Sequence, residues 1–254
     1  MSRRNFFLGY FVKHEEKINF LNLGKHPITN NFLKLQNPKN EFFYNLRLIF
    51  NSETKLVSLK KFVSPNKMFN DKYAHRASAS KTMRLAYSKL AKSISRKYKP
   101  KSILEIGSND GSLLSEFKKL GTQILGIEPA TNLSNLANQS NITTKNTFFS
   151  SQVCKEIIKS RNATVVVANN VIAHVEDLQD LMHGIQILLD KNGVFIFEVP
   201  YLVDLIKKLE FDTIYHEHLS YFSILPLLKL VEQFGLEIFD IRKQSVHGGT
   251  LRIF

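Results

Sequence analysis

Cysteine is nearly absent from this chain of 254 residues, which contains a single cysteine, Cys154, and no tryptophan. A lone cysteine forms no intramolecular disulfide, and without a Cys-x-x-Cys pair the chain cannot build a cysteine-ligated zinc ribbon. The sequence also lacks an apolar run of the roughly 20 residues that a membrane-spanning helix needs. These absences exclude a disulfide-stabilised scaffold and a membrane span, and they predict a protein of the reducing cytoplasm.

An export signal is also missing from the first residues. Residues 2–7 superficially resemble a twin-arginine signal, but the apolar run over residues 6–12 is interrupted by Gly9 and stops at a charged segment. This run is too short for the hydrophobic region of a signal peptide, and no small-residue cleavage site follows it. We therefore expect no export.

Negative charge is scarce in the first part of the chain. Residues 1–101 contain 22 Lys and Arg against 5 Asp and Glu, a net charge of +17, whereas the remaining residues have a net charge of −4. A basic surface of this kind attracts an anionic ligand such as a nucleotide sugar or RNA. A solvated surface with no ligand explains the same charges, so the sequence leaves both interpretations open.

The beginning of the chain predicts a small strand-rich module over residues 1–77. Short apolar runs there are separated by turn-forming pairs such as Asn37-Pro38. From residue 78 to 97 apolar residues recur at helical spacing, and Pro100 marks the stop. We expect this segment, residues 78–99, to be a helix that links the module to a second domain.

Strands and helices alternate after Pro100, which predicts a domain over residues 100–254. Repeated βα units favour a mostly parallel sheet covered by helices on both faces. A Gly248-Gly249 turn near the end indicates a terminal β-hairpin, and this arrangement predicts an α/β fold of the Rossmann-like class I methyltransferase type. The expected strands are 102–106, 123–127, 164–168, 194–199, 236–242 and 250–254, and the expected helices are 112–120, 133–138, 152–159, 178–189 and 224–234.

A glycine loop follows the first of these strands. Glu105, Gly107, Asn109 and Gly111 belong to the segment Leu-Glu-Ile-Gly-Ser-Asn-Asp-Gly, which ends the strand and opens the next helix. Glycines let the backbone turn tightly and approach a ligand, and doubly wound sheets bind nucleosides at the carboxyl ends of their strands. The spacing E-x-G-x-x-x-G differs from the dinucleotide pattern, so it provides less for a pyrophosphate.

A carboxylate 21 residues after Gly107 supports a nucleoside site. Glu128 ends the second strand, where a carboxylate can accept hydrogen bonds from both ribose hydroxyls. The alternative is a surface acid with no ligand. At the end of the 164–168 strand, Asn170 offers an amide to the part of the ligand beyond the nucleoside or serves only as a turn residue.

A segment containing Tyr215-His216-Glu217-His218 resembles the sugar C-methyltransferases of antibiotic deoxysugar pathways. The resemblance covers nearly the whole chain, and this segment is its most specific part. The other segments that carry it are residues 23–32, 73–80, 106–111, 169–175 and 247–252.

The resemblance implies S-adenosylmethionine as the cofactor and transfer of its methyl group to the carbon beside a ketone of a nucleotide-linked keto-deoxysugar. A C–H bond next to a carbonyl is a weak acid, so the enzyme must supply a base and stabilise an enolate. The family assigns acid–base work to residues that match His218, Glu217 and Tyr215, and Tyr73 is the further catalytic residue that it implies. A histidine suits a base at neutral pH.

Two other roles compete for the same segment. His216, Glu217 and His218 could ligate a metal, but in an extended segment their side chains would alternate in direction, and no further ligand cluster is evident, so we expect no metal. The segment could also serve only as a turn before the helix expected over residues 224–234, with Ser223 as the N-cap of that helix. This role would explain the presence of Ser223 but not that of the two histidines.

The chain departs from the family in three places. Residues 50–54 stand where the family has a pair of zinc-binding cysteines, so the N-terminal module is expected to fold without zinc. His75 and Arg76 replace two other positions of the family near Tyr73. The sequence stops at Phe254, where full-length members continue into a C-terminal domain.

Two other functions remain open. The basic first 101 residues favour a methyltransferase acting on RNA or another nucleic acid, but base methyltransferases usually have N/D-P-P-Y/F/W after the fourth strand, and residues 169–172 are Asn-Asn-Val-Ile. The missing cysteines and the short C-terminus favour a non-catalytic relative that binds a nucleotide sugar. The sequence leaves the sugar, the methylated carbon and the oligomeric state open.

Overall fold

The computed structural model describes residues 16–30, 32, 41–159, 163–245 and 248–254. Contacts divide the chain into two compact units, each assembled from separate stretches of sequence. The first unit comprises residues 1–68, 170–182 and 198–254, and the second comprises residues 69–169 and 183–197. None of the helices in the described part of the chain combines the length and hydropathy of a membrane-crossing segment.

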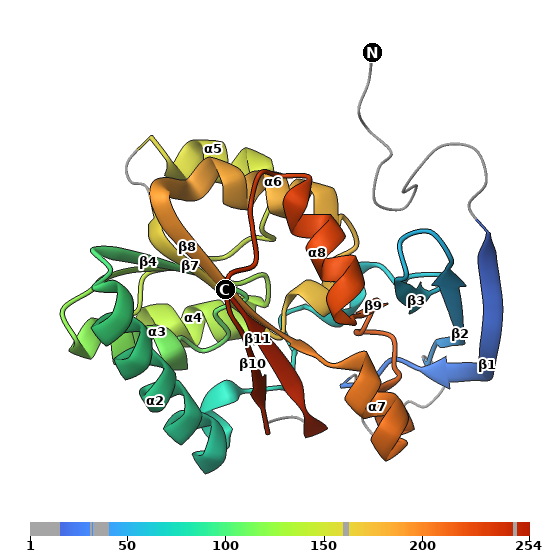
Figure 1. Cartoon of the computed structure of the whole chain (residues 1–254). Helices are drawn as coiled ribbons and strands as arrows, with labels where there is room; N and C mark the ends of the chain where they lie inside the picture. Colours follow the sequence, from blue (N-terminus) through green and yellow to red (C-terminus); the bar gives the residue numbers. More distant parts are fainter. Residues whose placement is uncertain (1–15, 31, 33–40, 160–162, 246–247) are drawn as a thin grey trace. The chain divides into compact units, whose positions relative to one another are not determined.

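An antiparallel sheet in the order β1-β2-β3-β9 forms one part of the first unit (Figure 1). Its strands are β1 (Lys17–Pro27), β2 (Phe43–Asn51), β3 (Val57–Leu59) and β9 (Ser220–Tyr221), and the short helix α1 (Pro65–Met68) follows β3. The last strand comes from far along the chain, because Val57 of β3 pairs with Tyr221 of β9. The N-terminal strands therefore share one sheet and one apolar cluster, which includes Leu48, Leu59 and Leu219, with the segment that carries the predicted catalytic residues.

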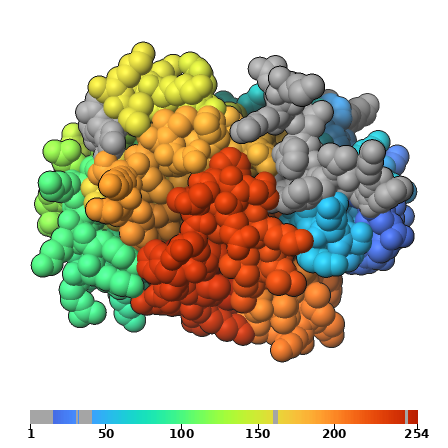
Figure 2. Space-filling view, turned by 45° about the horizontal axis from the view of Figure 1, so that its top comes forward, coloured from blue at the N-terminus to red at the C-terminus, as the bar shows by residue number. Residues whose placement is uncertain are grey.

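The rest of the first unit is helical and ends in a hairpin. The elements are η3 (Ile172–His174), α7 (Leu202–Lys208), η4 (Phe211–Thr213), α8 (Ile224–Glu232), β10 (Ile241–Gln244) and β11 (Thr250–Ile253). The apolar side of α8 is buried through Leu227, Leu230 and Val231. Lys229 Nζ of α8 donates to the Glu53 carbonyl at 2.8 Å, and Figure 2 shows the orange-red surface of this region bordering the blue and cyan N-terminal strands.

Parallel strands in the order β8-β7-β4-β5-β6 form the core of the second unit. All five residues of β4 are buried, as expected of a strand covered on both faces. Helices α2, α3 and α4 lie on one side of these strands and α5 on the other (Figure 1). The strands are β4 (Ser102–Ile106), β5 (Gln123–Ile127), β6 (Thr144–Lys145), β7 (Ala163–Asn169) and β8 (Leu189–Pro200), and the helices are η2 (Ala77–Ala79), α2 (Lys81–Tyr98), α3 (Ser112–Lys119), α4 (Thr131–Gln139), α5 (Ser151–Ile157) and α6 (Leu178–Leu188). Residues 178–182 of α6 and 198–200 of β8 are counted with the first unit.

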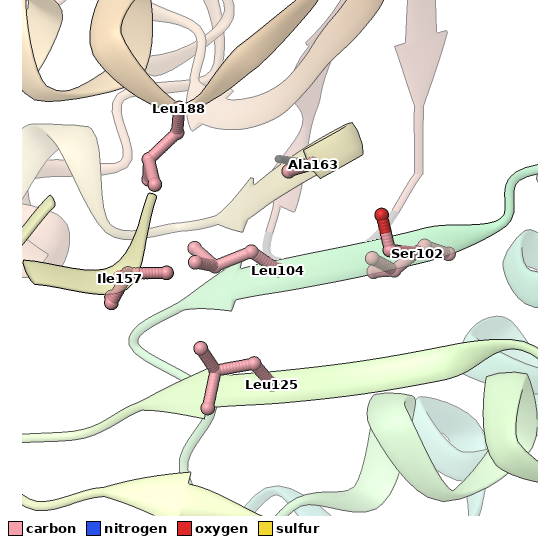
Figure 3. A pocket seen from close by; sticks show the side chains of 7 residues that line it. Ser102, Leu104, Leu125, Ile157, Ala163 and Leu188 are labelled. Atoms are coloured by element: carbon pink, nitrogen blue, oxygen red, sulfur yellow. The ribbon is translucent and has the colours of Figure 1, made fainter. Parts of the chain in front are cut away.

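A small apolar gap lies inside the second unit (Figure 3). Ser102 and Ala163, which begin β4 and β7, line it together with Leu104, Ile157 and Leu188. It therefore lies at the amino ends of the strands, the opposite end from the glycine loop. Its almost wholly aliphatic lining offers nothing that recognises a nucleoside, so we assign it to packing.

The predicted α/β fold with its terminal hairpin is confirmed, because β10 and β11 pair antiparallel with Ile241 opposite Ile253. The expected strand over residues 236–242 was wrong in its first part, since β10 begins only at Ile241. Gly235 has φ +67°, and the Leu236 N–H turns back to the Val231 carbonyl, so this stretch caps α8. The proposed boundaries at residues 77 and 100 remain a prediction.

Two local expectations also differ from the structure. Residues 215–218 form a turn, because the His218 N–H donates to the Tyr215 carbonyl at 3.1 Å, so the alternation considered for an extended segment does not apply. Ser223 does occupy the N-cap position of α8, but its side chain makes no capping hydrogen bond. The export prediction and His247 concern residues outside those that the structure describes.

Candidate active site

The loop after β4 is tightly wound against the end of β5. Gly107 has φ +65°, and the N–H groups of Gly107 and Ser108 both donate to the Ile127 carbonyl, at 2.8 and 3.1 Å. Gly111 has φ +77° and begins α3, and a Cβ atom there would lie 2.9 Å from Ile142. Both glycines are therefore required by the backbone conformation, as the sequence predicted.

Glu128 lies at the centre of this loop region. Its Oε2 accepts a hydrogen bond from the Asn109 N–H and its Oε1 accepts one from the Ala130 N–H, both at 2.8 Å. The side chain is buried, and burial raises the pKa of the carboxyl although the two backbone N–H groups act in the opposite direction. Each carboxylate oxygen has a second lone pair, so two ribose hydroxyls can still donate to it.

Glu105 supplies a second buried carboxyl in the same unit. Burial, reinforced by the charges of Glu128 and Asp110, raises its pKa well above the ordinary value. Its Oε2 has no hydrogen-bond partner in the described part of the chain, and the same is true of Ser108 Oγ. Buried polar atoms without partners are rare, so these two atoms fit a site that a polar ligand completes.

The side chain of Asn109 binds the chain just before α2. Its Oδ1 accepts from the Ala77 N–H at 2.9 Å and its Nδ2 donates to the His75 carbonyl at 3.1 Å. Neighbouring Asp110 accepts from the Ser78 N–H at 3.0 Å. Burial opposes ionisation of Asp110, but hydrogen bonds from Ser112 and Ser78 outweigh it and lower the pKa. The Asn109 side chain thus holds the loop in place, and its role in cofactor binding remains a prediction.

Tyr73 lies in the second unit, next to the start of α4. Its carbonyl accepts from Asn132 Nδ2 at 2.9 Å, and its half-buried ring packs edge-on against Phe69 with ring centres 5.2 Å apart. The backbone contact fixes the position of the residue. The catalytic role of its hydroxyl remains a prediction.

Asn170 belongs to the first unit and adopts a left-handed conformation, with φ +53°. Its N–H donates to the Glu198 carbonyl at 2.8 Å. The Glu198 side chain is held in turn by Arg252 at 2.7 and 3.0 Å and by Thr250 at 2.7 Å. Asn170 Oδ1 is buried without a partner in the described part of the chain, so it can accept a hydrogen bond, and its role in cofactor binding remains a prediction.

Tyr215 and His218 form the central pair of the first unit. The Tyr215 hydroxyl lies 3.1 Å from His218 Nε2, and His218 Nδ1 lies 2.8 Å from the Thr213 carbonyl oxygen. A carbonyl oxygen only accepts, so Nδ1 bears the hydrogen and Nε2 of the neutral imidazole presents its lone pair to the phenol. Burial, followed by the charge of Glu217, raises the pKa of the Tyr215 hydroxyl, which keeps it a neutral donor.

The other two members of the turn are buried. Glu217 is 1% exposed, and its Oε1 accepts a hydrogen bond from Asn30 Nδ2 at 2.9 Å. His216 is equally buried, and its Nε2 lies 3.3 Å from the Tyr44 carbonyl oxygen. Burial lowers the pKa of His216. His216 therefore attaches the turn to β2 and Glu217 attaches it to the turn that follows β1, which the sequence analysis did not foresee.

His174 is a residue that the sequence analysis did not single out, although it lies in one of the segments that carry the resemblance. Its ring centre lies 4.9 Å from that of His218. The backbone holds the two elements together, because the Leu219 N–H donates to the Ala173 carbonyl at 2.7 Å. The signal was available: a histidine shortly after a βα strand end is a typical catalytic position in an open sheet. Within the described residues no group of three potential ligands could hold a metal ion.

Comparison with known proteins agrees with this geometry. The family model "Methyltransferase domain" matches residues 72–241. The chain belongs to this methyltransferase family. A second model, "Putative zinc binding domain", matches residues 11–69, a stretch with no cysteine and two histidines, His14 and His26. The predicted family is thereby confirmed.

Similar proteins give the same fold. The C-methyltransferase NovU of Streptomyces niveus is 31% identical over 246 residues, which cover 95% of this methyltransferase and 58% of NovU. The chain thus spans little more than half the length of that relative. The PH0226 protein of Pyrococcus horikoshii (TM-score 0.55, 13% identity, 76% of this chain and 98% of that one) has a similar fold. So has magnesium protoporphyrin IX methyltransferase of Synechocystis, solved with bound SAH (TM-score 0.50, 12% identity, 67% and 81%). The match to the methyltransferase family model supports S-adenosylmethionine as the cofactor.

Proposed function

We propose that this methyltransferase transfers the methyl group of S-adenosylmethionine to a carbon next to the ketone of a nucleotide-linked keto-deoxysugar, through an enolate. The observation that carries the proposal is the Tyr215–His218 pair, in which a neutral phenol faces the lone pair of an imidazole of fixed tautomer. A base beside a hydrogen-bond donor is what enolisation requires. Similarity to the C-methyltransferase NovU supports methylation at carbon.

In this proposal His218 is the base. When the phenol of Tyr215 turns from Nε2 to the ketone oxygen of the substrate, Nε2 is free to take the proton from the neighbouring carbon. The Thr213 carbonyl then stabilises the imidazolium through Nδ1–H. Tyr215 donates its hydrogen bond to the enolate oxygen, and its raised pKa keeps the proton on the phenol. His174, whose ring lies beside that of His218, is placed to pass the proton onward.

Glu217 has an indirect role in the proposal. The sequence analysis assigned it to proton removal together with His218, but a carboxylate that is 1% exposed and bonded to Asn30 is poorly accessible to a substrate carbon. We therefore infer that Glu217 acts through its position and charge. It anchors the turn over residues 215–218 to Asn30, in the turn after β1, and helps to keep Tyr215 protonated.

The cofactor residues of the proposal lie mainly in the second unit. Glu128 would accept the ribose hydroxyls, and Glu105 Oε2 and Asn170 Oδ1, which have no partner within the described residues, would meet polar groups of the methionine moiety. The bound cofactor supplies an electrophilic methyl group on a sulfonium. Bond formation from the enolate carbon breaks the sulfur–methyl bond, so S-adenosylhomocysteine and the C-methylated ketone are the products.

Methylation of RNA is the second candidate, and its support is the basic stretch of residues 1–101. An RNA methyltransferase has no need of a base placed for a C–H next to a carbonyl. A non-catalytic sugar-binding role has no need of an imidazole held in one tautomer. The Tyr215–His218 pair therefore favours the C-methyltransferase.

The test is methylation and solvent-deuterium exchange with a panel of nucleotide keto-sugars, followed by mass spectrometry. His218→Ala should retain affinity for S-adenosylhomocysteine while losing about a hundred- to ten-thousand-fold in both rates, the usual effect of removing a general base. His183→Ala, which removes an exposed histidine from α6, is the matched control and should behave as wild type.

Two results would count against the proposal. Deuterium exchange at the wild-type rate in His218→Ala would show that His218 is not the base. A wild-type protein that binds the cofactor but neither exchanges nor methylates any keto-sugar would make the non-catalytic interpretation the better one. Methylation of RNA by the same preparation would favour the second candidate.

A further inference from the structure

The tautomer of His218 depends on one carbonyl group, which belongs to Thr213 at the end of the short helix η4. Two bonds tie Thr213 to Glu210, the N-cap residue before this helix: the Thr213 N–H and the Thr213 hydroxyl both donate to the Glu210 carbonyl, at 3.2 and 2.8 Å. Glu210 is therefore the point from which the direction of the Thr213 carbonyl is set. Any group that fixes Glu210 also fixes the acceptor of His218 Nδ1.

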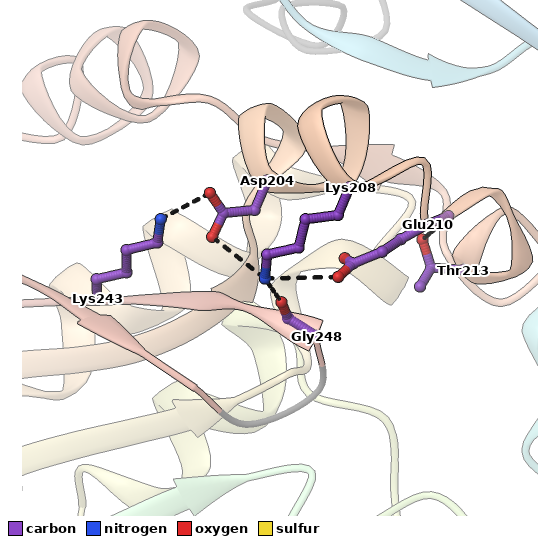
Figure 4. Close-up of polar contacts among 6 residues, drawn as sticks. All are labelled: Asp204, Lys208, Glu210, Thr213, Lys243 and Gly248. Carbon is purple, nitrogen blue, oxygen red and sulfur yellow. Dashed lines mark hydrogen bonds and ion pairs between the residues drawn. The ribbon is translucent and has the colours of Figure 1, made fainter.

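Lys208 is that group. Its ammonium lies 3.5 Å from Glu210 Oε1 and 3.9 Å from Asp204 Oδ2, and it donates to the Gly248 carbonyl (Figure 4). Asp204 is only 5% exposed in its side chain and also accepts from Lys243 Nζ at 2.7 Å. One ammonium thus joins α7, the N-cap residue of η4 and the turn of the terminal hairpin.

Gly248 completes the arrangement by its lack of a side chain. A Cβ atom there would lie 2.7 and 2.8 Å from the two carboxylate oxygens of Glu210, and the residue has φ +78°. The Gly248 backbone therefore lies directly beside the Glu210 carboxylate. The ammonium of Lys208 and the backbone of Gly248 both restrict where this carboxylate can lie.

We propose that Lys208 is a positioning residue for His218, which holds Glu210 and the Gly248 turn so that the Thr213 carbonyl receives Nδ1–H and Nε2 faces Tyr215. This inference rests on the proposed function for its catalytic meaning, but the tautomer is a property of the free protein. Taken alone, the ion pair between the half-exposed Lys208 and Glu210 contributes little to the free energy of unfolding. Its effect on the rate of methyl transfer can be much larger, because displacing a catalytic group by about 1 Å can lower the rate about a hundredfold.

The experiment measures the tautomer of His218 directly by two-dimensional ¹⁵N–¹H NMR of histidine-labelled protein, with the His218 signals assigned by their loss in His218→Asn. Lys208→Met removes the ammonium and keeps a long side chain. Lys207→Met removes the same charge from the neighbouring exposed position of α7 and is the matched control. Lys208→Arg should restore the contacts in part.

Two further variants approach the same contact from its other partners. Glu210→Gln weakens the carboxylate, and Gly248→Ala introduces the close contact with it. Gly235→Ala is the control for Gly248→Ala, since Gly235 also has a positive φ, +67°, but has nothing within 4 Å of the position of an added Cβ atom. If Lys208→Met does not fold, Glu210→Gln and Gly248→Ala still test whether this contact sets the tautomer of His218.

We expect wild type and both controls to show the Nδ1–H tautomer. Lys208→Met, Glu210→Gln and Gly248→Ala should show a mixture of tautomers, with methyl transfer reduced at least tenfold and affinity for S-adenosylhomocysteine unchanged. An unchanged tautomer in these variants would overturn the positioning role, whatever their activity. If wild type methylates no keto-sugar, the proposed function fails, while the tautomer measurement still decides the role of Lys208.

Discussion

Replacement of Glu128 by glutamine tests how the second unit binds its cofactor. The carboxylate accepts one hydrogen bond from each of two backbone N–H groups, of Asn109 and Ala130. Glutamine has one oxygen and one NH₂ group, so it can accept from only one of them and must present donors to the other. At least one hydrogen bond to a charged acceptor is lost, and ribose hydroxyls meet a poorer acceptor.

The expected loss of cofactor affinity comes from the hydrogen bonds between the ribose hydroxyls and this carboxylate, because the two backbone hydrogen bonds are made in the free protein as well. A hydrogen bond to a charged group contributes about 1.5–3 kcal/mol, which corresponds to a roughly tenfold to 150-fold weaker affinity for S-adenosylhomocysteine. Isothermal titration calorimetry measures it. Glu116→Gln, on α3 of the same unit, makes the same chemical change away from the loop and should bind as wild type.

The pH dependence provides a second readout. The ionised form of Glu128 accepts the ribose hydrogen bonds, so affinity should be complete above its pKa and fall as the pH drops through it. Because burial raises this pKa, the fall should begin at a higher pH than for an exposed glutamate. The affinity of Glu128→Gln for S-adenosylhomocysteine should not show this fall with pH. Equal affinity of wild type and Glu128→Gln at neutral pH would refute the assignment of Glu128 to the ribose.

Three further predictions concern stability and metal content. The folded-state pKa of Glu105 lies well above its unfolded value, so ionisation of this group should lower the free energy of unfolding as the pH rises from about 4.5. The urea midpoint of Glu105→Gln should therefore exceed that of wild type by a margin that grows between pH 5 and 8. A difference that stays constant with pH would contradict this. Arg252→Met removes the cationic partner of the buried Glu198 and should lower the free energy of unfolding by about 3–5 kcal/mol. Arg242→Met removes the exposed arginine opposite Arg252 on the neighbouring strand and should lower it by less than about 1 kcal/mol. Similar losses in the two variants would argue against the buried pair. Elemental analysis after dialysis against a chelator should find no stoichiometric zinc, because residues 11–69 contain no cysteine and two histidines, and one zinc per chain would overturn this expectation.

The second unit was largely predictable from the sequence. Its strands are short apolar runs, and Gly107 and Gly111 mark a turn that only glycine adopts easily. The position of Glu128 at a strand end followed from the alternation of strands and helices alone. Local sequence patterns were sufficient here because the contacts within each βα unit join residues that are close in the sequence.

The catalytic turn was less predictable because its geometry depends on distant partners. Tyr215 and His218 are close in the sequence, so their proximity was predictable. The Thr213 carbonyl, which sets the tautomer of His218, reaches Nδ1 only because of the backbone conformation of the turn, which the sequence pattern does not reveal. The contact of Glu217 with Asn30 joins residues 187 positions apart, which no periodicity reveals. The error over residues 236–240 has a similar cause. The apolar residues after Gly235 read as a strand, but the Leu236 N–H closes α8, and the backbone meets the end of the chain only from Phe239, whose N–H donates to the Phe254 carbonyl.

The pairing of β3 with β9 has a consequence for how the protein is made. The ribosome releases Val57 roughly 160 residues before its partner Tyr221. At about 5–20 residues per second, the edge of β3 waits about 8–30 s for the strand that covers it. During this interval the N-terminal strands present an open hydrogen-bonding edge, which is a site for misassociation between nascent chains. The turn over residues 215–218 is made directly before the strand that closes this edge, so a chain that stalls before residue 215 has neither.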